Sequence, residues 1–177
     1  MLTEWESFYV IVGSSAAALT GLQFVVMALI ADSQARATSG EISAFGSPGV
    51  VHFCAALFVS ATLSAPWHSL RGAGTAIVLC GAAGAFYALV VMRRARHQKR
   101  YKPVFEDWVW HVALPLISYV ALLASGLMLT RVPAPSLFVI GAVTLLLVFI
   151  GIHNAWDTVI YVTLNQQSPD GENTDKQ

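Results

Sequence analysis

Three residues near the end of the chain are spaced so that they share one face of a helix. His153, Asp157 and Tyr161 follow one another at intervals of four residues, and Asn154 stands beside the first of them. Residues four apart are neighbours on a helix surface. A carboxylate beside an imidazole can fix the tautomer of the ring and raise its basicity, which suits a proton relay or a metal ligand. The stretch is therefore a candidate site for protons, ions or a small ligand.

Further polar side chains meet this stretch if the elements around it are membrane helices that alternate in direction. His52 begins the second apolar segment and His111 begins the fourth. Gln23 lies about 12 Å from the inner end of the first segment, at about 1.5 Å per residue. With His153 and Asp157, the two added histidines could supply three or four ligands to a divalent metal. As a pair of axial ligands they could instead hold a haem, so the sequence names no single cofactor.

A structural role for the same residues stays open beside the functional one. Asp157 could pair with Arg93 or Arg94 at the inner end of the third segment, which would neutralise its charge. His52 and His111 each stand near a predicted helix end, where a histidine can lie at the membrane interface. An ionisable group inside a membrane span nevertheless suggests function, because its presence there is costly.

The positions of the charged residues along the chain indicate whether water or lipid surrounds these polar residues. Hydrophobic residues make up 56% of the 177 residues and charged residues only 11%, against roughly 25% charged in a soluble domain. The charges leave five gaps, each long enough for the about 20 apolar residues that cross a bilayer. We predict an all-α membrane protein, a bundle of five transmembrane helices in one domain (1–166) with a disordered tail (167–177). The expected spans are about 8–31, 48–66, 72–92, 108–130 and 136–163.

Basic residues set the expected orientation. The loop RRARHQKRYKP (93–103) carries a dense basic run, whereas Arg71 and Arg131 stand alone in the short turns of the other side. Positive charge in short loops marks the cytoplasmic side. The N-terminus is therefore expected outside and the C-terminus in the cytoplasm. The net charge of zero gives no reason to expect a nucleic-acid partner.

Small residues recur on two of the expected spans and predict close helix contacts, because they let helix backbones approach each other in a membrane. Contacts within one chain and contacts between the copies of a homo-oligomer would both use such faces, and the sequence leaves the two open. The residues are Gly13, Ala17 and Gly21 in the first span and Gly72, Ala76, Cys80 and Gly84 in the third.

The first and last spans also carry a resemblance. The segments WESFYVIVGSSAAALTGLQFVVMALIAD (5–32) and GIHNAWDTVIY (151–161) resemble a group of small bacterial multi-spanning proteins, some of which are labelled as modulators of a membrane-bound AAA protease. The resemblance implies a multi-pass protein of the bacterial inner membrane. It implies no activity and no role for any particular residue.

Three functions fit the sequence. The first is a small ion or proton channel or transporter, oligomeric, with a His/Asp site in the inner leaflet of the bilayer. The second is a membrane-embedded enzyme that acts on a lipid or isoprenoid, with His153 or Asp157 as acid or base. The third is an accessory subunit whose small-residue faces dock another membrane protein. The absence of a phosphate-binding loop, a nucleophile elbow and an HExxH motif disfavours an enzyme.

Overall fold

The computed structural model describes residues 2–34, 47–97 and 108–166 of the chain, and nearly all of them are helical. No strand occurs among these residues. The elements are α1 (Leu2–Gln34), α3 (Ser47–Ser64), α4 (Leu70–His97), the π-helical turn η1 (Val109–Ala113), α6 (Leu114–Met128) and α7 (Pro133–Gln166).

The helices are compatible with a polytopic membrane protein. Within the described ranges, α1, α4, η1 with α6, and α7 are long and apolar enough to cross a membrane, and α3 is a shorter apolar helix. The prediction of an all-helical membrane protein is confirmed at this level, while the number of spans and the orientation stay predictions. The helix α4 continues to His97, so the first five residues of the basic run are helical. Residues 98–103 of that run and the tail 167–177 lie outside the described residues.

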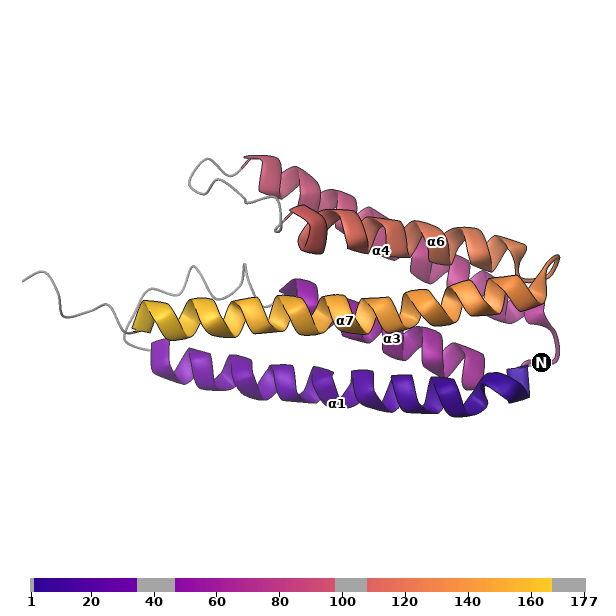
Figure 1. The fold of residues 1–177 in the computed structure, drawn as a ribbon, viewed down its shortest axis with the longest axis horizontal. Coiled ribbons are helices and arrows are strands. Elements are labelled where there is room, and N and C mark those ends of the chain that lie inside the picture. The colour runs from indigo at the N-terminus through magenta and orange to yellow at the C-terminus, as the bar shows by residue number, and fades with distance from the viewer. Residues whose placement is uncertain (1, 35–46, 98–107, 167–177) are drawn as a thin grey trace, which may run out of the picture.

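The helix α7 joins two helix pairs into one bundle. Figure 1 shows α1 along one side, α4 and α6 along the other, and α7 between them, with α3 behind α7. The closest pairings are α4 with α6 and α1 with α3, and α7 packs on both α3 and α6. The apolar side chains of Leu137, Ile140, Leu147 and Ile150 on α7 are fully buried. The central helix therefore supplies much of the core.

The helices alternate in direction, and this sets which helix ends meet. The two short turns, α3 to α4 and α6 to α7, lie at the end of the bundle where α1 begins (Figure 1). In the first turn, the Trp67 indole N–H donates a hydrogen bond of 2.6 Å to the carbonyl oxygen of Thr62 near the end of α3. The start of α3, the start of η1 and the end of α7 consequently share the opposite end. These segments carry the candidate polar residues.

Glycines bring α4 and α6 into backbone contact. A Cβ built on Gly74 would lie 3.0 Å from the carbonyl oxygen of Gly126, and one built on Gly81 would lie 2.6 Å from the backbone nitrogen of Leu123. The buried positions of α4 alternate in steps of three and four residues, the spacing of a coiled-coil contact line. These positions are Gly74, Ile77, Gly81, Gly84 and Ala88, and Ala73 beside the first of them is also buried.

The α4 contact line differs from the predicted line Gly72, Ala76, Cys80 and Gly84. Of these four residues only Gly84 is buried in the contact, while Ala76 and Cys80 are partly exposed. Gly72 packs on the Trp67 ring of the preceding turn, where a Cβ would lie 2.5 Å from the ring. The physical reason is that steps of four residues rotate by about 40° each around a helix of 3.6 residues per turn. A strict four-residue line therefore winds off the contact face.

The predicted small-residue face of α1 is used only in part. A Cβ built on Gly13 would lie 2.8 Å from the Cβ of Ser60, so α1 and α3 pack closely there. Ala17 is exposed, and a Cβ built on Gly21 would meet no atom of the described residues within 4 Å. This part of α1 is left uncovered by the described helices.

Candidate functional site

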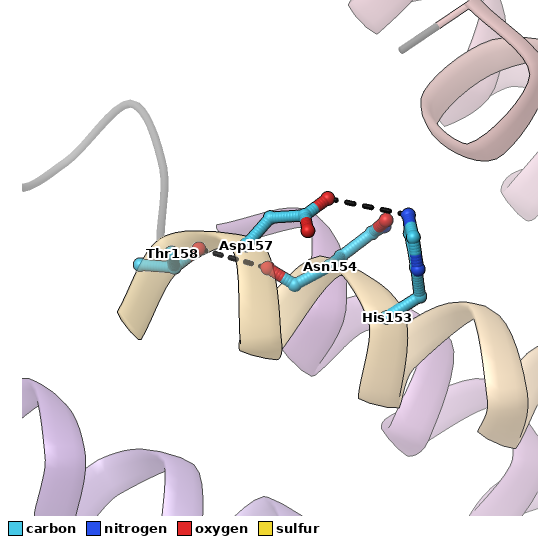
Figure 2. A network of polar contacts seen from close by, with 4 residues as sticks. All are labelled: His153, Asn154, Asp157 and Thr158. Carbon is cyan, nitrogen blue, oxygen red and sulfur yellow. Dashed lines mark hydrogen bonds and ion pairs between the residues drawn. The ribbon is translucent and has the colours of Figure 1, made fainter. Parts of the chain in front are cut away.

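The predicted pairing of His153 with Asp157 is present in the structure. The Nε2 atom of His153 lies 3.3 Å from the Oδ2 atom of Asp157, one turn further along α7 (Figure 2). Their side chains are 26% and 42% exposed. Among the described side chains, the partner of Asp157 is this histidine and not Arg93. The side chain of Arg94 lies outside the described part of the chain, so the alternative pairing with it stays untested.

The imidazole of His153 is also held from a second element. It stacks on the indole of Trp110 in η1, with ring centroids 4.0 Å apart and an angle of 23° between the planes. With the carboxylate of Asp157 at its edge, the ring is held in both position and orientation.

The π-helical turn that presents Trp110 has a local cause. Pro115 has no backbone N–H, so it cannot donate to the carbonyl group one turn earlier. The amide of Leu114 instead bonds to the carbonyl oxygen of Val109, five residues back. Such turns often occur at functional sites. The helix therefore opens into a widened turn just before Pro115, beside the candidate site.

Asn154 is the most unusual residue of the site. Its side chain is only 4% exposed, and neither atom of its amide group has a hydrogen-bond partner among the described residues. Figure 2 shows the amide on the same side of α7 as the paired side chains of His153 and Asp157. A buried polar group without a partner costs about 1–3 kcal/mol, so native proteins rarely keep one without a reason such as a bound water or ion.

Close packing of α3 on α7 explains the burial of Asn154. A Cβ built on Gly49 would lie 3.3 Å from the carbonyl oxygen of Gly151 and 3.9 Å from the Cβ of Asn154. One built on Gly151 would lie 2.5 Å from the ring of Phe53. The start of α3 therefore covers the amide of Asn154.

His52 contributes a second buried polar contact at this end. Its ring is 2% exposed, and its Nδ1 atom lies 2.8 Å from the hydroxyl oxygen of Tyr119 on α6. His111 of η1 lies near His52 at this end of the bundle. The buried Nδ1 atom of His111 has no hydrogen-bond partner within the described ranges. The contact partner Tyr119 was not predicted, because it lies 67 residues from His52 and no local pattern points to it.

We call these side chains the polar cluster. It comprises His52, Trp110, His111, Tyr119, His153, Asn154 and Asp157, from α3, η1, α6 and α7. Sequence reasoning predicted five of the seven and missed Trp110 as a contact of His153. The position of Trp110 next to His111 in the sequence was the available signal.

Two predicted candidates stand apart from the polar cluster. Gln23 is buried on α1, and no hydrogen bond or ion pair between described residues links it to the cluster. Tyr161 continues α7, but its side chain lies outside the described residues. No three His, Cys, Asp or Glu side chains in the described ranges are grouped closely enough to hold a metal ion.

The chemistry open to the polar cluster is proton exchange. Imidazole and carboxylate side chains act as proton donors and acceptors in proteins, and the pair of His153 and Asp157 places one of each 3.3 Å apart. Comparison with known proteins found no family model, no curated protein and no solved structure that matches the chain. The functional conclusion therefore rests on the geometry of the cluster.

Proposed function

We propose that the protein is a small polytopic membrane protein that transfers protons, with the polar cluster as the site where protons enter or leave. The observation that carries the proposal is the partly exposed pair of His153 and Asp157 beside the buried amide of Asn154, which has no hydrogen-bond partner among the described residues. The pair reaches the surface, where it can exchange protons with water. The amide offers a donor and an acceptor further inside, where a water molecule could continue the path.

The weak energetic value of the pair supports a chemical role for it. An ion pair that is a quarter to two-fifths exposed contributes about 0–1 kcal/mol to stability. A charged carboxylate inside a membrane helix is costly. Stability alone thus gives little reason for a His–Asp pair at this position.

The placement of the recesses favours proton transfer over an enzyme. An acid or base catalyst must lie within hydrogen-bond reach of a bound substrate, which requires a pocket beside it. The two main recesses of the described residues lie between α3 and α4 and between the starts of α1 and α7. Neither is lined by His153, Asn154 or Asp157. A proton relay needs no such pocket.

Proton flux into liposomes tests the proposal. The purified protein, reconstituted with a pH-sensitive dye inside the vesicles, should acidify the interior faster than empty vesicles do under an imposed potential. Asp157→Asn keeps the shape of the side chain but removes its charge, so we expect flux to fall at least tenfold while the melting temperature in detergent changes little.

Glu6→Gln is the matched control, because Glu6 is an exposed carboxylate on α1, remote from the polar cluster. Its flux should equal that of the unaltered protein. Flux no greater than in empty vesicles, or equal flux in the Asp157→Asn variant, would contradict proton transfer through this site.

We also propose that the protein is a homo-oligomer in a bacterial inner membrane. The uncovered Ala17 and Gly21 on α1 support the first part, because small residues allow a second helix to approach closely. The resemblance of the first and last helices to small bacterial inner-membrane proteins supports the second. Cross-linking in native membranes before and after Gly21→Leu tests the oligomer: an unchanged cross-linked species would remove this face from the interface.

A further inference from the structure

A recess lined by aromatic rings lies between the starts of α1 and α7, at the end of the bundle opposite the polar cluster (Figure 1). We call it the aromatic recess, and its volume is about 430 Å³. Its lining residues are Glu4, Trp5 and Phe8 of α1 and Ala134 and Phe138 of α7. No residue of the polar cluster is among them, so the aromatic recess is separate from the site of the proposed proton transfer.

The indole ring of Trp5 stands at steep angles to both phenyl rings of the aromatic recess. The planes of Trp5 and Phe8 meet at 90°, with their ring centroids 5.6 Å apart. The planes of Trp5 and Phe138 meet at 79°, with centroids 4.8 Å apart. Neither phenyl ring therefore stacks flat on the indole. Phe138 is 68% exposed, so its ring is open to a ligand from outside the bundle.

Gly141 of α7 makes room for this arrangement of rings. A Cβ built on Gly141 would lie 2.8 Å from the ring of Trp5 and 3.4 Å from the ring of Phe8. A larger residue at this position would push the indole off α7. The aromatic recess is therefore held in shape by the packing of α1 on α7.

Glu4 gives the aromatic recess a negative charge. Its side chain is exposed, and it is the only charged residue among the lining side chains. The exposed cations of the two turns at this end, Arg71 and Arg131, do not line the recess. A carboxylate in the first turn of a helix also complements the helix dipole. The charge therefore indicates a ligand only in combination with the rings.

Aromatic rings and a carboxylate together select an organic cation. The face of an aromatic ring attracts a cation, and a group of such rings is a recurrent binding site for methylated ammonium groups. A metal ion such as Ca²⁺ would need several oxygen ligands, and an anion would be repelled by Glu4. A neutral hydrocarbon would gain nothing from the carboxylate. The lining thus favours a ligand that is both positively charged and greasy.

The position of the aromatic recess along α1 fits such a ligand. The apolar segment of α1 that is long enough to cross a membrane begins at Leu2, beside Glu4 and Trp5. The recess therefore lies at one end of this candidate span, at the level of the lipid headgroups, where tryptophan is enriched. Water-soluble cations and the ammonium groups of zwitterionic lipids both reach this level.

We propose that the aromatic recess binds a methylated ammonium group, with the cation against the rings of Trp5, Phe8 and Phe138 and beside the carboxylate of Glu4. A small solute such as choline and the headgroup of a zwitterionic lipid carry this same group. Binding is expected to depend on both the rings and the charge. It is independent of the proposed proton transfer, because the two sites share no residue.

Choline and its neutral isostere, in which a tert-butyl group replaces the trimethylammonium group, are the matched probes. They have nearly the same shape and differ in charge. Isothermal titration of the full chain in an uncharged detergent should show choline binding about tenfold tighter than the isostere, as expected for a cation against aromatic rings.

Two variants test the residues, and each has a matched control. Phe138→Leu and Glu4→Gln should each weaken choline binding about tenfold. Phe149→Leu and Glu6→Gln should leave it unchanged, because Phe149 and Glu6 are exposed residues of the same two helices that do not line the recess. All four side chains are exposed, so the melting temperatures should stay close to that of the unaltered protein.

Native mass spectrometry with phosphatidylcholine and phosphatidylglycerol separates the two sources of the ammonium group. Preferential retention of phosphatidylcholine that is lost in Phe138→Leu would assign the site to a lipid headgroup. Choline binding without such retention would assign it to a small solute.

Three outcomes would overturn the site. Equal binding of choline and its isostere would show an apolar recess with no preference for a cation. Equal effects of Phe138→Leu and Phe149→Leu would show that choline binds elsewhere. A lower melting temperature of Glu4→Gln with unchanged choline binding would mean that the carboxylate serves only the start of α1.

Discussion

Two buried tyrosines show how one side chain type has different roles in this bundle. The hydroxyl group of Tyr119 is 2.8 Å from the Nδ1 atom of His52. The hydroxyl group of Tyr9 is equally enclosed but has no hydrogen-bond partner among the described residues. Removal of a buried hydroxyl is costly only where it leaves a partner unsatisfied. The two residues therefore form a natural pair for comparison.

We expect Tyr119→Phe to lower the free energy of unfolding by about 1–2 kcal/mol, because it leaves the buried ring nitrogen of His52 without its partner. Tyr9→Phe should be neutral or slightly stabilising, since the Tyr9 hydroxyl makes no hydrogen bond with another described residue. Denaturant unfolding of both variants in the same detergent measures the difference. Equal effects would mean that the contact between Tyr119 and His52 adds nothing to stability.

At the residue scale, the sequence predicted what lies on one helix and missed what crosses between helices. The spacing of His153 and Asp157 was enough to place them together. The stack of His153 on Trp110 and the contact of His52 with Tyr119 depend on the rotation and depth of separate helices, which no local pattern records. The absence of a hydrogen-bond partner for the Asn154 amide among the described residues likewise depends on how Gly49 and Gly151 bring α3 against α7.

At the scale of elements, the contact of α4 with α6 is the most constrained in the bundle. A Cβ on Gly81 would meet the backbone of Leu123 at 2.6 Å, and a Cβ on Gly84 would overlap the ring of Tyr119. Backbone atoms cannot move aside as the end of a flexible side chain can. Small residues on α4 were predicted to make contacts, but the helical repeat of 3.6 places the true line at steps of three and four. Steps of four residues therefore predict the right helix for the contact with α6. Of the four residues they predict, only Gly84 lies in that contact.

Gly81→Leu should separate α4 from α6 and lower the free energy of unfolding by about 3 kcal/mol or more, at the upper end of overpacking effects because the neighbour is backbone. Ala82→Leu is the control, because Ala82 is the neighbouring residue on α4 and its side chain is exposed. Thermal melting in detergent compares the two. A Gly81→Leu variant as stable as Ala82→Leu would contradict the close contact of these helices.

At the scale of the whole molecule, the predicted orientation can be tested through the turn between α3 and α4. Ser69 is exposed in that turn, at the end of the bundle where α1 begins. The basic run from Arg93 lies toward the opposite end, which the positive-inside rule places in the cytoplasm. The polar cluster would then face the cytoplasmic side, and Arg93 would meet the anionic inner leaflet.

In a variant without Cys54 and Cys80, a cysteine at Ser69 should react with an impermeant thiol reagent added outside intact cells. A cysteine at Gln98 should react only after the membrane is permeabilised. The reverse pattern would invert the orientation and place the polar cluster at the outer surface. Labelling of both cysteines in intact cells would point to chains inserted in two orientations.

The central position of α7 has a consequence for how the protein is made. The helix that packs on both α3 and α6 is the last of the described helices to leave the ribosome. The pairs α1–α3 and α4–α6 can form while synthesis continues, but their shared partner does not yet exist. Until α7 inserts, the contact of α3 with α4 and the bond between His52 and Tyr119 can link the two pairs, but the surfaces of α3 and α6 that α7 covers stay open. The bundle can therefore be completed only when its final described helix has inserted.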